Sequence, residues 1–207
     1  MSGSDPPGGA DRNVLAILAA DAGRLVDVLT EAFEHYPAMR FVFAGKRPAL
    51  HKAVGFFVAS RVLRNEPLLG IEDGHHLAAG AIVTIPDGRV SPPEVSVRRE
   101  ALWADVGAEA RARYEACSAV WERFAAPAPH IHLNMIGVRA SCRGLGLGRA
   151  LLEHVQDIAR RTPKAEGVTL TTEDPANVPL YEHAGYTVVD HARIAPDLET
   201  WWMFRRS

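Results

Sequence analysis

The sequence predicts a single α/β domain, in which helices pack on a central sheet. Short apolar, strand-like runs alternate along the chain with longer runs that carry apolar residues at helical spacing. One strand-to-helix junction contains three glycines at alternate positions. The 207 residues are 47% hydrophobic, which is enough for one sizeable core, and no internal repeat is found.

Composition and charge exclude several classes of protein. A net charge of −2 argues against a general nucleic-acid or membrane-surface binder. No apolar run is long enough to cross a bilayer, and the amino terminus lacks a secretory signal, so we expect a cytoplasmic protein. The two cysteines, Cys117 and Cys142, support neither a disulfide scaffold nor a zinc site, and we interpret Cys142 as a buried or incidental thiol.

The first third of the chain predicts a tail, a strand and two helices. Residues 1–12 are rich in Ser, Gly, Pro and Asp, so we expect them to form a disordered tail. The apolar run at 14–19 is suited to a first strand. Asp21 can cap a helix that Pro37 ends, and 48–65 carries the apolar spacing of a second helix.

Residues 67–85 predict a β-hairpin. Two apolar runs flank the pair Asp73-Gly74, and Asp-Gly at such a place is a strong signal for a tight hairpin turn. Gly80 interrupts the second run, which is typical of a bulge or of a close approach by another part of the chain.

After the hairpin, the apolar spacing changes from strand-like to helical, which predicts a helical insert at about 91–128. Between two proline-rich joints, two runs of helical spacing include the aromatic residues Trp103, Trp121 and Phe124. Such an insert is a candidate lid over a substrate, although an ordinary packed helical pair fits the same pattern. We expect 13–207 to form one domain that contains this insert.

The remaining elements surround the glycine-rich junction. A strand at 131–138 alternates His130, His132 and Asn134 with apolar residues, so one face is polar although the strand should be central. After the junction, the apolar spacing at 147–161 predicts a helix that ends in two arginines, where cations suit the helix dipole. The final elements are a strand at 168–171, a short helix after Asn177 that Gly185 ends, and strands at 186–190 and 200–204.

The glycine-rich junction reads RGLGLGR, from Arg143 to Arg149. Glycines at alternate positions let backbone N–H groups turn toward one centre, and at the start of a helix these donors form a site for a phosphate-type anion. A P-loop is excluded because Arg149 and Ala150 follow Gly148 in place of Lys and a hydroxyl residue. A dinucleotide fingerprint is excluded because Arg149 occupies the place of its third glycine. A glycine-rich turn without a ligand is the remaining alternative.

The same loop resembles a known family motif. Its spacing R-x-x-G-x-G, with Arg143, Gly146 and Gly148 at the fixed places, is similar to the pyrophosphate-binding motif of the GNAT superfamily of coenzyme A-dependent N-acyltransferases. That resemblance implies the GNAT fold, a mixed α/β (α+β) architecture whose mostly antiparallel sheet has about seven strands and helices on both faces. The fourth and fifth strands of that sheet would be parallel but splayed apart.

A second match follows the fifth expected strand. Asn177, Tyr181 and the pair Gly185-Tyr186 resemble the family signature N-x-x-x-Y-x-x-x-G-aromatic. Further similarities are L-x-x-x-G-V at 133–138, the hairpin turn and the carboxyl-terminal TWWMFRR. This arrangement resembles the branch that contains puromycin N-acetyltransferase.

The resemblance implies acetyl-CoA (coenzyme A) as co-substrate and no metal. In the gap between the splayed strands, backbone groups at 136–138 would pair with the pantetheine arm as another strand does. The loop would hold the pyrophosphate, and Asn177 would reach the pantetheine, although a role as cap of the short helix is a compatible alternative. The cofactor-binding residues implied in this way are Ile136, Gly137, Val138, Arg143, Gly144, Leu145, Gly146, Leu147, Gly148, Arg149 and Asn177.

The resemblance also implies direct attack of a neutral amine on the thioester, and we name two catalytic candidates. Tyr181 occupies the family position for the acid that protonates the leaving thiolate, and a phenol with a pKa of about 10 can donate at neutral pH. The alternative for Tyr181 is an aromatic ring packed on its helix. His132 is the first choice for the base, because it should point from the central strand toward the acceptor. The backbone N–H of Ile136 is the candidate for stabilising the oxyanion.

Two departures from the family affect the choice of base. Relatives often carry an aromatic residue where His132 stands and a carboxylate where Thr171 stands. Glu173 is near enough in sequence to replace that carboxylate, or it simply sits at the mouth of the helix. His130 and the histidine pair at 75–76 are interpreted as strand and turn residues, so no metal site follows.

The sequence therefore predicts an enzyme that uses acetyl-CoA to acetylate a primary amine on a small molecule. We expect a monomer or homodimer, with no nucleic-acid or membrane partner. Two alternatives stay open: an acetyltransferase acting on a protein or peptide amine, and a non-catalytic module that binds or senses acyl-CoA. The aromatic residues of the insert favour a closed pocket, whereas the missing acidic base permits the non-catalytic module.

Overall fold

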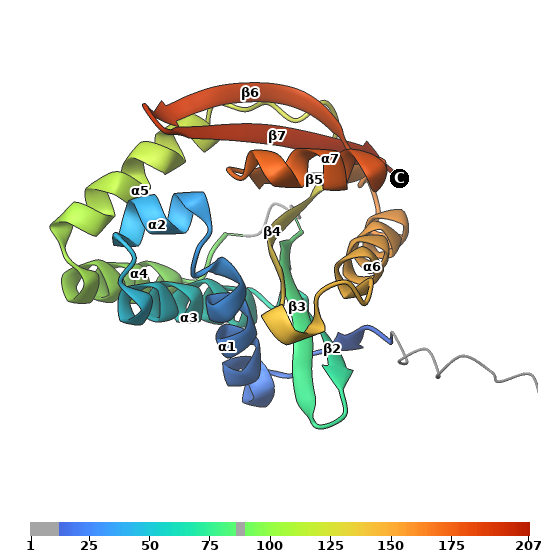
Figure 1. The fold of residues 1–207 in the computed structure, drawn as a ribbon, viewed down its shortest axis with the longest axis horizontal. Coiled ribbons are helices and arrows are strands. Elements are labelled where there is room, and N and C mark those ends of the chain that lie inside the picture. Colours follow the sequence, from blue (N-terminus) through green and yellow to red (C-terminus); the bar gives the residue numbers. More distant parts are fainter. Residues whose placement is uncertain (1–12, 86–89) are drawn as a thin grey trace, which may run out of the picture.

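The computed structural model describes residues 13–85 and 90–207, which form a seven-stranded sheet with helices on both faces (Figure 1). Residues 1–12, where we expected a disordered tail, lie outside the described residues, as do 86–89. The first part of the chain forms β1 (Leu15–Ala16), α1 (Ala22–Phe33), α2 (Pro37–Phe43), α3 (Arg47–Leu63), β2 (Leu68–Asp73) and β3 (His76–Thr84). The second part forms α4 (Pro93–Val106), α5 (Ala108–Trp121), β4 (Ile131–Val138), α6 (Leu147–Arg161), β5 (Gly167–Thr172), α7 (Val178–His183), β6 (Thr187–Ala195) and β7 (Leu198–Arg206).

The sheet confirms the expected fold class. Its strands follow the order β1-β2-β3-β4-β5-β7-β6, and every neighbouring pair is antiparallel except β4 and β5. These two parallel strands pair only from Ile131 to Leu133, although β4 continues to Val138. The strands therefore separate from Asn134 onward, while β4 stays paired with β3 on its other side.

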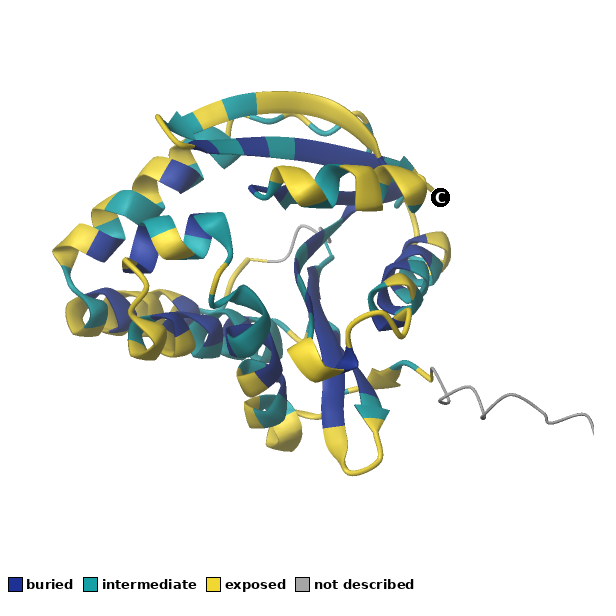
Figure 2. Ribbon diagram, in the orientation of Figure 1, coloured by how far each residue is buried: buried dark blue, intermediate teal, exposed yellow. Residues whose placement is uncertain are grey.

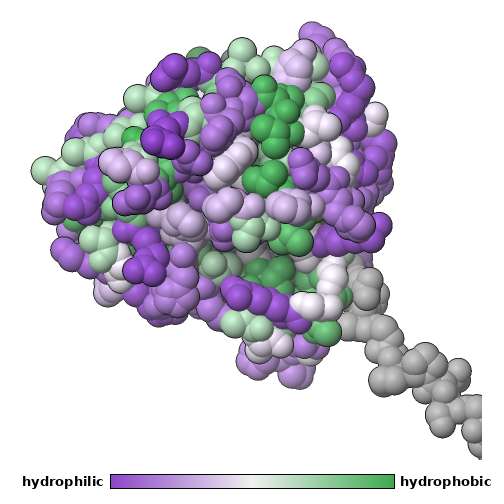
Figure 3. All heavy atoms as spheres, turned by 45° about the horizontal axis from the view of Figure 1, so that its top comes forward, coloured by the Kyte–Doolittle hydropathy of each residue, from purple (hydrophilic) through white to green (hydrophobic). Residues whose placement is uncertain are grey.

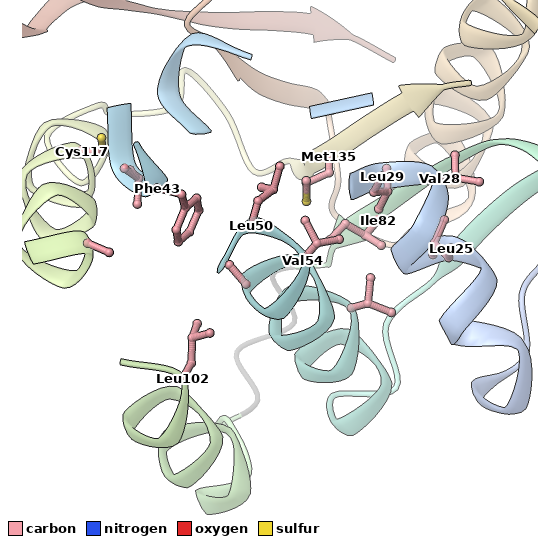
Figure 4. Packing of buried hydrophobic residues seen from close by; sticks show 14 of the residues in the cluster. Leu25, Val28, Leu29, Phe43, Leu50, Val54, Ile82, Leu102, Cys117 and Met135 are labelled. Atoms are coloured by element: carbon pink, nitrogen blue, oxygen red, sulfur yellow. The ribbon is translucent and has the colours of Figure 1, made fainter. Parts of the chain in front are cut away.

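A bulge in β4 coincides with the start of this gap. In the pairing with β3, Leu133 lies opposite Val83 and Met135 lies opposite Ile82, so Asn134 is the extra residue. Leu133 packs in the cluster that contains α6. Met135 instead packs with α1 and α3 (Figure 4). Buried and partly buried residues alternate along the whole strand as expected, but Met135 packs on the opposite face from Leu133 because of the bulge.

Two hydrophobic clusters cover the two faces of the sheet. The helices α1, α3 and the insert pack on one face, and α6 packs on the other (Figure 1). The predicted apolar stripe of α6 is buried, including Leu147, Leu151 and Val155. The edge strand β6 is largely exposed, whereas β7 beside it is mostly buried (Figure 2). None of the described helices is both long and apolar enough to span a bilayer.

Pro37 begins a helix of its own. α1 stops at Phe33, and Pro37 begins a separate short helix, α2, which the sequence analysis did not anticipate. Proline suits this place because the first turn of a helix has no acceptor for its N–H group. Since α2 packs against α5, it joins the first part of the chain to the insert.

The expected helical insert is present as α4 and α5. The two helices lie between β3 and β4 in sequence, and they contact α3 and α2 respectively. Leu102, Trp103 and Cys117 from these helices are buried in the same cluster as α1 and α3. The insert thus contributes directly to the hydrophobic core.

The hairpin of β2 and β3 is confirmed, and Gly80 within it marks a close approach. A Cβ built on Gly80 would lie 2.1 Å from Leu25 Cδ1 of α1 and 3.1 Å from Leu69 O. The bulges of this part of the sheet lie at other residues. Glycine at this position therefore lets α1 pack directly on β3.

We expect Gly80→Ala to destabilise the fold by about 1–3 kcal/mol, because the added methyl group overpacks the contact with Leu25. Gly55→Ala is the matched control, since Gly55 lies inside α3 and a Cβ there meets nothing within 4 Å. That control should be stabilising by roughly 0.5–1 kcal/mol, the usual helical preference for alanine. Urea unfolding of both variants measures the difference, and equal effects would contradict the packing contact.

Candidate active site

A cavity of about 1000 Å³ opens where β4 and β5 separate. One part of its lining comes from β4, α6 and α7, and the other comes from the α1–α2 connection, α3, α5 and β7. In the space-filling view, hydrophobic residues reach the surface near the middle of the face, between hydrophilic surroundings (Figure 3). The cavity thus connects the glycine-rich loop with the helical insert.

The glycine-rich loop leads into α6, as expected. Gly144 and Gly146 have φ angles of +80° and +76°, a left-handed conformation that favours glycine. The N–H of Ala150 bonds to Gly146 O, whereas the N–H groups of residues 147–149 have no acceptor within the helix. These free amides, together with the positive end of the helix dipole, form an anion site.

The surroundings of Gly148 leave room for a ligand. A Cβ built on it would meet only Val138 Cγ2, at 3.7 Å, so packing does not require glycine here, yet the residue lines the cavity. Arg143 and Arg149 line the same end, and neither forms an ion pair with another residue of the described ranges. Free amides and two unpaired cations fit the charge of a pyrophosphate.

Glu31 of α1 holds the segment that precedes the loop. Its carboxylate accepts a hydrogen bond from the N–H of Ala140 at 2.9 Å, and the Arg139 guanidinium pairs with its other oxygen. The bond from Ala140 and the charge of Arg139 lower the pKa of the Glu31 carboxyl. The start of the glycine-rich loop is thereby tied to α1.

The strand β4 presents an unpaired edge to the cavity. Beyond Leu133 it has no partner on the β5 side, and its residues line the cavity. Gly137 has a packing role as well, because a Cβ there would lie 2.5 Å from Ala32 Cβ of α1. An extended ligand can fill such an edge as an added strand would. Of the residues predicted to hold the cofactor, 136–138, Arg143, Gly148 and Arg149 thus line one cavity, whereas 144–147 are not part of its lining.

Asn177 lines the cavity but does not cap α7. Its Nδ2 donates to Thr172 Oγ1 at 3.4 Å, and no side-chain hydrogen bond caps the helix. Capping occurs just before it, where Asp174 accepts a bond from Ala176 N–H at 3.0 Å. The alternative role of Asn177 as a cap is therefore wrong, and its amide lies beside the end of β5.

Tyr181 lies in α7 and lines the same cavity. Burial raises the pKa of its phenol well above the usual value, and the negative charges of Glu173 and Asp174 raise it further. Its ring packs edge-on against Tyr186, with centroids 6.0 Å apart. The phenol is therefore fully protonated near neutral pH and is available as a proton donor.

His132 lines the cavity from β4 and is partly buried. Burial lowers the pKa of its imidazole to about 4, and the neighbouring His130 and Arg61 contribute to the same shift. Its Nδ1 lies at hydrogen-bond distance, 3.0 Å, from Thr169 Oγ1, and its ring centroid is 5.9 Å from that of Trp202. The imidazole is thus neutral at physiological pH, and Nε2 is its remaining acceptor or donor.

Glu173 has a more central place than its position after β5 indicated. It is only 5% exposed, and its carboxylate accepts hydrogen bonds from Trp121 Nε1 (3.0 Å), Thr200 Oγ1 (2.7 Å) and Tyr36 OH (3.0 Å). Burial raises the pKa of this carboxyl, while the three donors oppose the rise. Sequence reasoning missed Tyr36 and Thr200 altogether, because no local pattern marks them as neighbours of Glu173.

Aromatic rings line the end of the cavity near the insert. Phe57, Tyr114 and Trp121 form a continuous row, with successive ring centroids 6.1 Å apart. Of the three insert residues expected to favour a pocket, only Trp121 lines the cavity. Trp103 packs on Tyr114 within the core, and Phe124 packs against β7.

The remaining candidates have structural surroundings. His130 borders the cavity, but its Nδ1 lies 3.0 Å from Ala128 O, and the pair at 75–76 belongs to the hairpin turn. Both cysteines are free and buried, and burial raises the pKa of Cys117 to about 12. Neither thiol is therefore placed as a nucleophile by these surroundings.

A comparison with protein families identifies one match. The acetyltransferase (GNAT) family matches residues 27–186, which is most of the chain. The matched part includes β4, the glycine-rich loop, β5 and α7, the elements that form one end of the cavity.

Solved structures share the fold. A histone acetyltransferase HPA2 and related acetyltransferase from Corynebacterium glutamicum is 22% identical with a TM-score of 0.66, covering 94% of this chain and 96% of its own. The ribosomal-protein-S18-alanine N-acetyltransferase of Escherichia coli is 16% identical with a TM-score of 0.58, covering 94% and 92%. A putative acetyltransferase from Salmonella typhimurium, solved with its cofactor acetyl-CoA, is 16% identical with a TM-score of 0.57, covering 94% and 92%.

We expect the His132 imidazole to titrate near pH 4, which NMR of ring-labelled protein can measure after assignment with His132→Gln. The unfolded chain binds this proton near pH 6.5, whereas the folded chain binds it only near pH 4. The free energy of unfolding should therefore be highest above pH 6.5 and decrease as the pH drops toward 4. His132→Gln should flatten that decline. A His132 pKa at or above 6.5 would contradict the buried, neutral state.

Proposed function

The chain belongs to the acetyltransferase (GNAT) family and is an acyltransferase, and we propose that it transfers the acetyl group of acetyl-CoA to a primary amine of a small molecule. The observation that carries this proposal is the continuous cavity, which contains both the anion site of the glycine-rich loop and an aromatic end beside the insert. A cofactor along β4 and an acceptor among the rings would meet between these ends, near His132 and Tyr181. Holding two reactants together is itself a large part of such catalysis.

For the cofactor, we propose that segments 136–138 and 143–149 and the amide of Asn177 hold acetyl-CoA. The open edge of β4 suits the pantetheine arm, and the free amides at the start of α6 suit the pyrophosphate. Arg143 and Arg149 add positive charge at that end. When bound, acetyl-CoA supplies a thioester carbonyl that an amine can attack.

Two side chains of the cavity have the chemistry for proton transfer, and we propose a role for each. Tyr181, which stays protonated at neutral pH, donates a proton to the leaving thiolate. His132, which is neutral, receives a proton from the amine through Nε2. The backbone N–H of Ile136 is our candidate for stabilising negative charge on the carbonyl oxygen.

The shape of the acceptor end supports a small molecule over a polypeptide. The insert, the α1–α2 connection and β7 border this end on several sides, whereas a polypeptide needs an open groove. We further propose that the chain belongs to the puromycin N-acetyltransferase-like branch. The sequence features that support this branch are L-x-x-x-G-V at 133–138, the hairpin turn at Asp73-Gly74 and the carboxyl-terminal TWWMFRR.

A screen of primary amines with acetyl-CoA, read by detection of the released thiol, tests the proposed function. Amine-dependent thiol release with small molecules supports it. Thermal stabilisation by acetyl-CoA without release for any amine would instead identify a non-catalytic binding module. Release with peptides alone would identify a polypeptide acceptor.

We expect Gly148→Glu to weaken acetyl-CoA binding at least tenfold more than Gly148→Gln, about 1.4 kcal/mol. Both side chains fill the same open space beside Val138, but only the glutamate places a negative charge against the pyrophosphate. Calorimetric titration with acetyl-CoA measures the two dissociation constants. Equal losses of affinity in the two variants would mean that the added volume weakens binding and that the added negative charge does not.

We expect Tyr181→Phe to lower kcat by roughly 100-fold, as removal of a general acid commonly does. The ring contact with Tyr186 is retained, so the dissociation constant of acetyl-CoA should change less than twofold. Steady-state thiol release and calorimetry separate the two effects. An unchanged kcat would assign Tyr181 to packing alone.

A further inference from the structure

Glu173 carries a buried carboxyl group, and burial raises its pKa, so a cation that reaches this group would favour its ionised form. Its three hydrogen bonds come from neutral donors, and no Lys, Arg or His of the described ranges forms an ion pair with it. Three donors occupy three of its four lone-pair directions. A buried carboxylate of this kind is stabilised by a cation that reaches its free direction, and Glu173 lines the cavity.

Two basic side chains that line the cavity, Arg61 and His132, do not supply a free positive charge. Arg61 lines the cavity, but its Nη1 bonds to Glu66 at 2.8 Å and to Thr84 at 2.6 Å, so its charge is balanced. His132 is neutral at physiological pH. Asp174 also lines the cavity and adds a second carboxylate. The side chains around Glu173 therefore favour a positive ligand.

Aromatic rings flank the same carboxylate on both sides. The row of Phe57, Tyr114 and Trp121 ends at the hydrogen bond from Trp121 to Glu173. On the other side, Tyr36 donates to Glu173 and packs edge-on against Phe33, with ring centroids 4.9 Å apart. The N–H of Trp121 and the O–H of Tyr36 are both committed to Glu173, so the rings offer a ligand mainly their apolar faces and edges.

We propose that the acceptor is a cationic primary amine on a flat aromatic or apolar body, with its ammonium group bound by Glu173 and its body among these rings. The inference rests on the proposed function, because it names the acceptor of that reaction. Rings beside a carboxylate are a favourable surface for such a cation, since the negative ring faces also attract it. The same charges exclude an acceptor with a carboxylate next to its amine, because Glu173 repels it and Arg61 is already paired.

The full-length protein with acetyl-CoA and four acceptors tests the substrate class. The acceptors are 2-phenylethylamine, butylamine, phenylalanine and a short alanine peptide with a free amino terminus. Butylamine lacks the ring, phenylalanine adds the carboxylate, and the peptide represents a polypeptide. We expect kcat/KM for 2-phenylethylamine to exceed each of the others at least tenfold. Equal or better use of phenylalanine or the peptide would overturn the inference while leaving the proposed acetyl transfer in place.

Glu173→Gln tests the ammonium contact. We expect it to raise KM for 2-phenylethylamine at least tenfold while leaving the dissociation constant of acetyl-CoA within twofold. The alcohol 2-phenylethanol should inhibit the parent and the variant with equal inhibition constants, because it has the same body without the charge. Glu166→Gln is the matched control, since Glu166 pairs with Arg206 at the surface.

A purely structural role of Glu173 predicts different results. If the carboxylate only holds Tyr36, Trp121 and Thr200 together, Glu173→Gln should weaken the binding of the alcohol as much as the binding of the amine. Thr200→Val removes one of the three bonds and keeps the charge, so by our proposal it preserves amine binding within threefold. An equal loss of affinity for the amine and the alcohol in Glu173→Gln, or an unchanged KM for the amine, would overturn the inference. Absence of thiol release with every amine would refute the proposed function itself.

Discussion

The early end of the pairing between β4 and β5 is the constraint on which the rest of the site depends. Two parallel strands in the middle of a sheet would ordinarily stay paired, but here only three residue pairs form before the strands separate. The bulge at Asn134 lies at the point of separation, and a bulge bends the strand that carries it. Backbone groups that lose a strand partner need another, and we propose that an extended ligand pairs with the edge of β4 at this gap.

The two ends of the cavity differ in their ionisable groups. The loop end has free amides at the start of α6 and two arginines without an ion-pair partner among the described residues, and the insert end has the Glu173 carboxyl group among aromatic rings. The neutral His132 lines the same cavity. By our proposal, an anionic cofactor would be attracted to the first end and a cationic acceptor to the second.

The buried carboxyl group of Glu173 holds several distant parts of the chain together at one end of the cavity. Burying a carboxylate is unfavourable, and hydrogen bonds from α5, β7 and the α1–α2 connection offset that cost. Those bonds connect residues that are 52, 27 and 137 positions apart. The carboxyl group therefore joins three elements at the end of the cavity that we propose for the acceptor.

The sequence by itself determined the features that depend on local chemistry. The glycine spacing at 143–149, the apolar stripe of α6 and the Asp-Gly hairpin each express backbone or helical geometry within a few residues, and the fold class follows from their order and from the family resemblance. Only the tertiary structure decided the bulge at Asn134, the low pKa of His132 and the partners of Glu173. These features arise where distant elements meet, and neither periodicity nor spacing records which elements will meet.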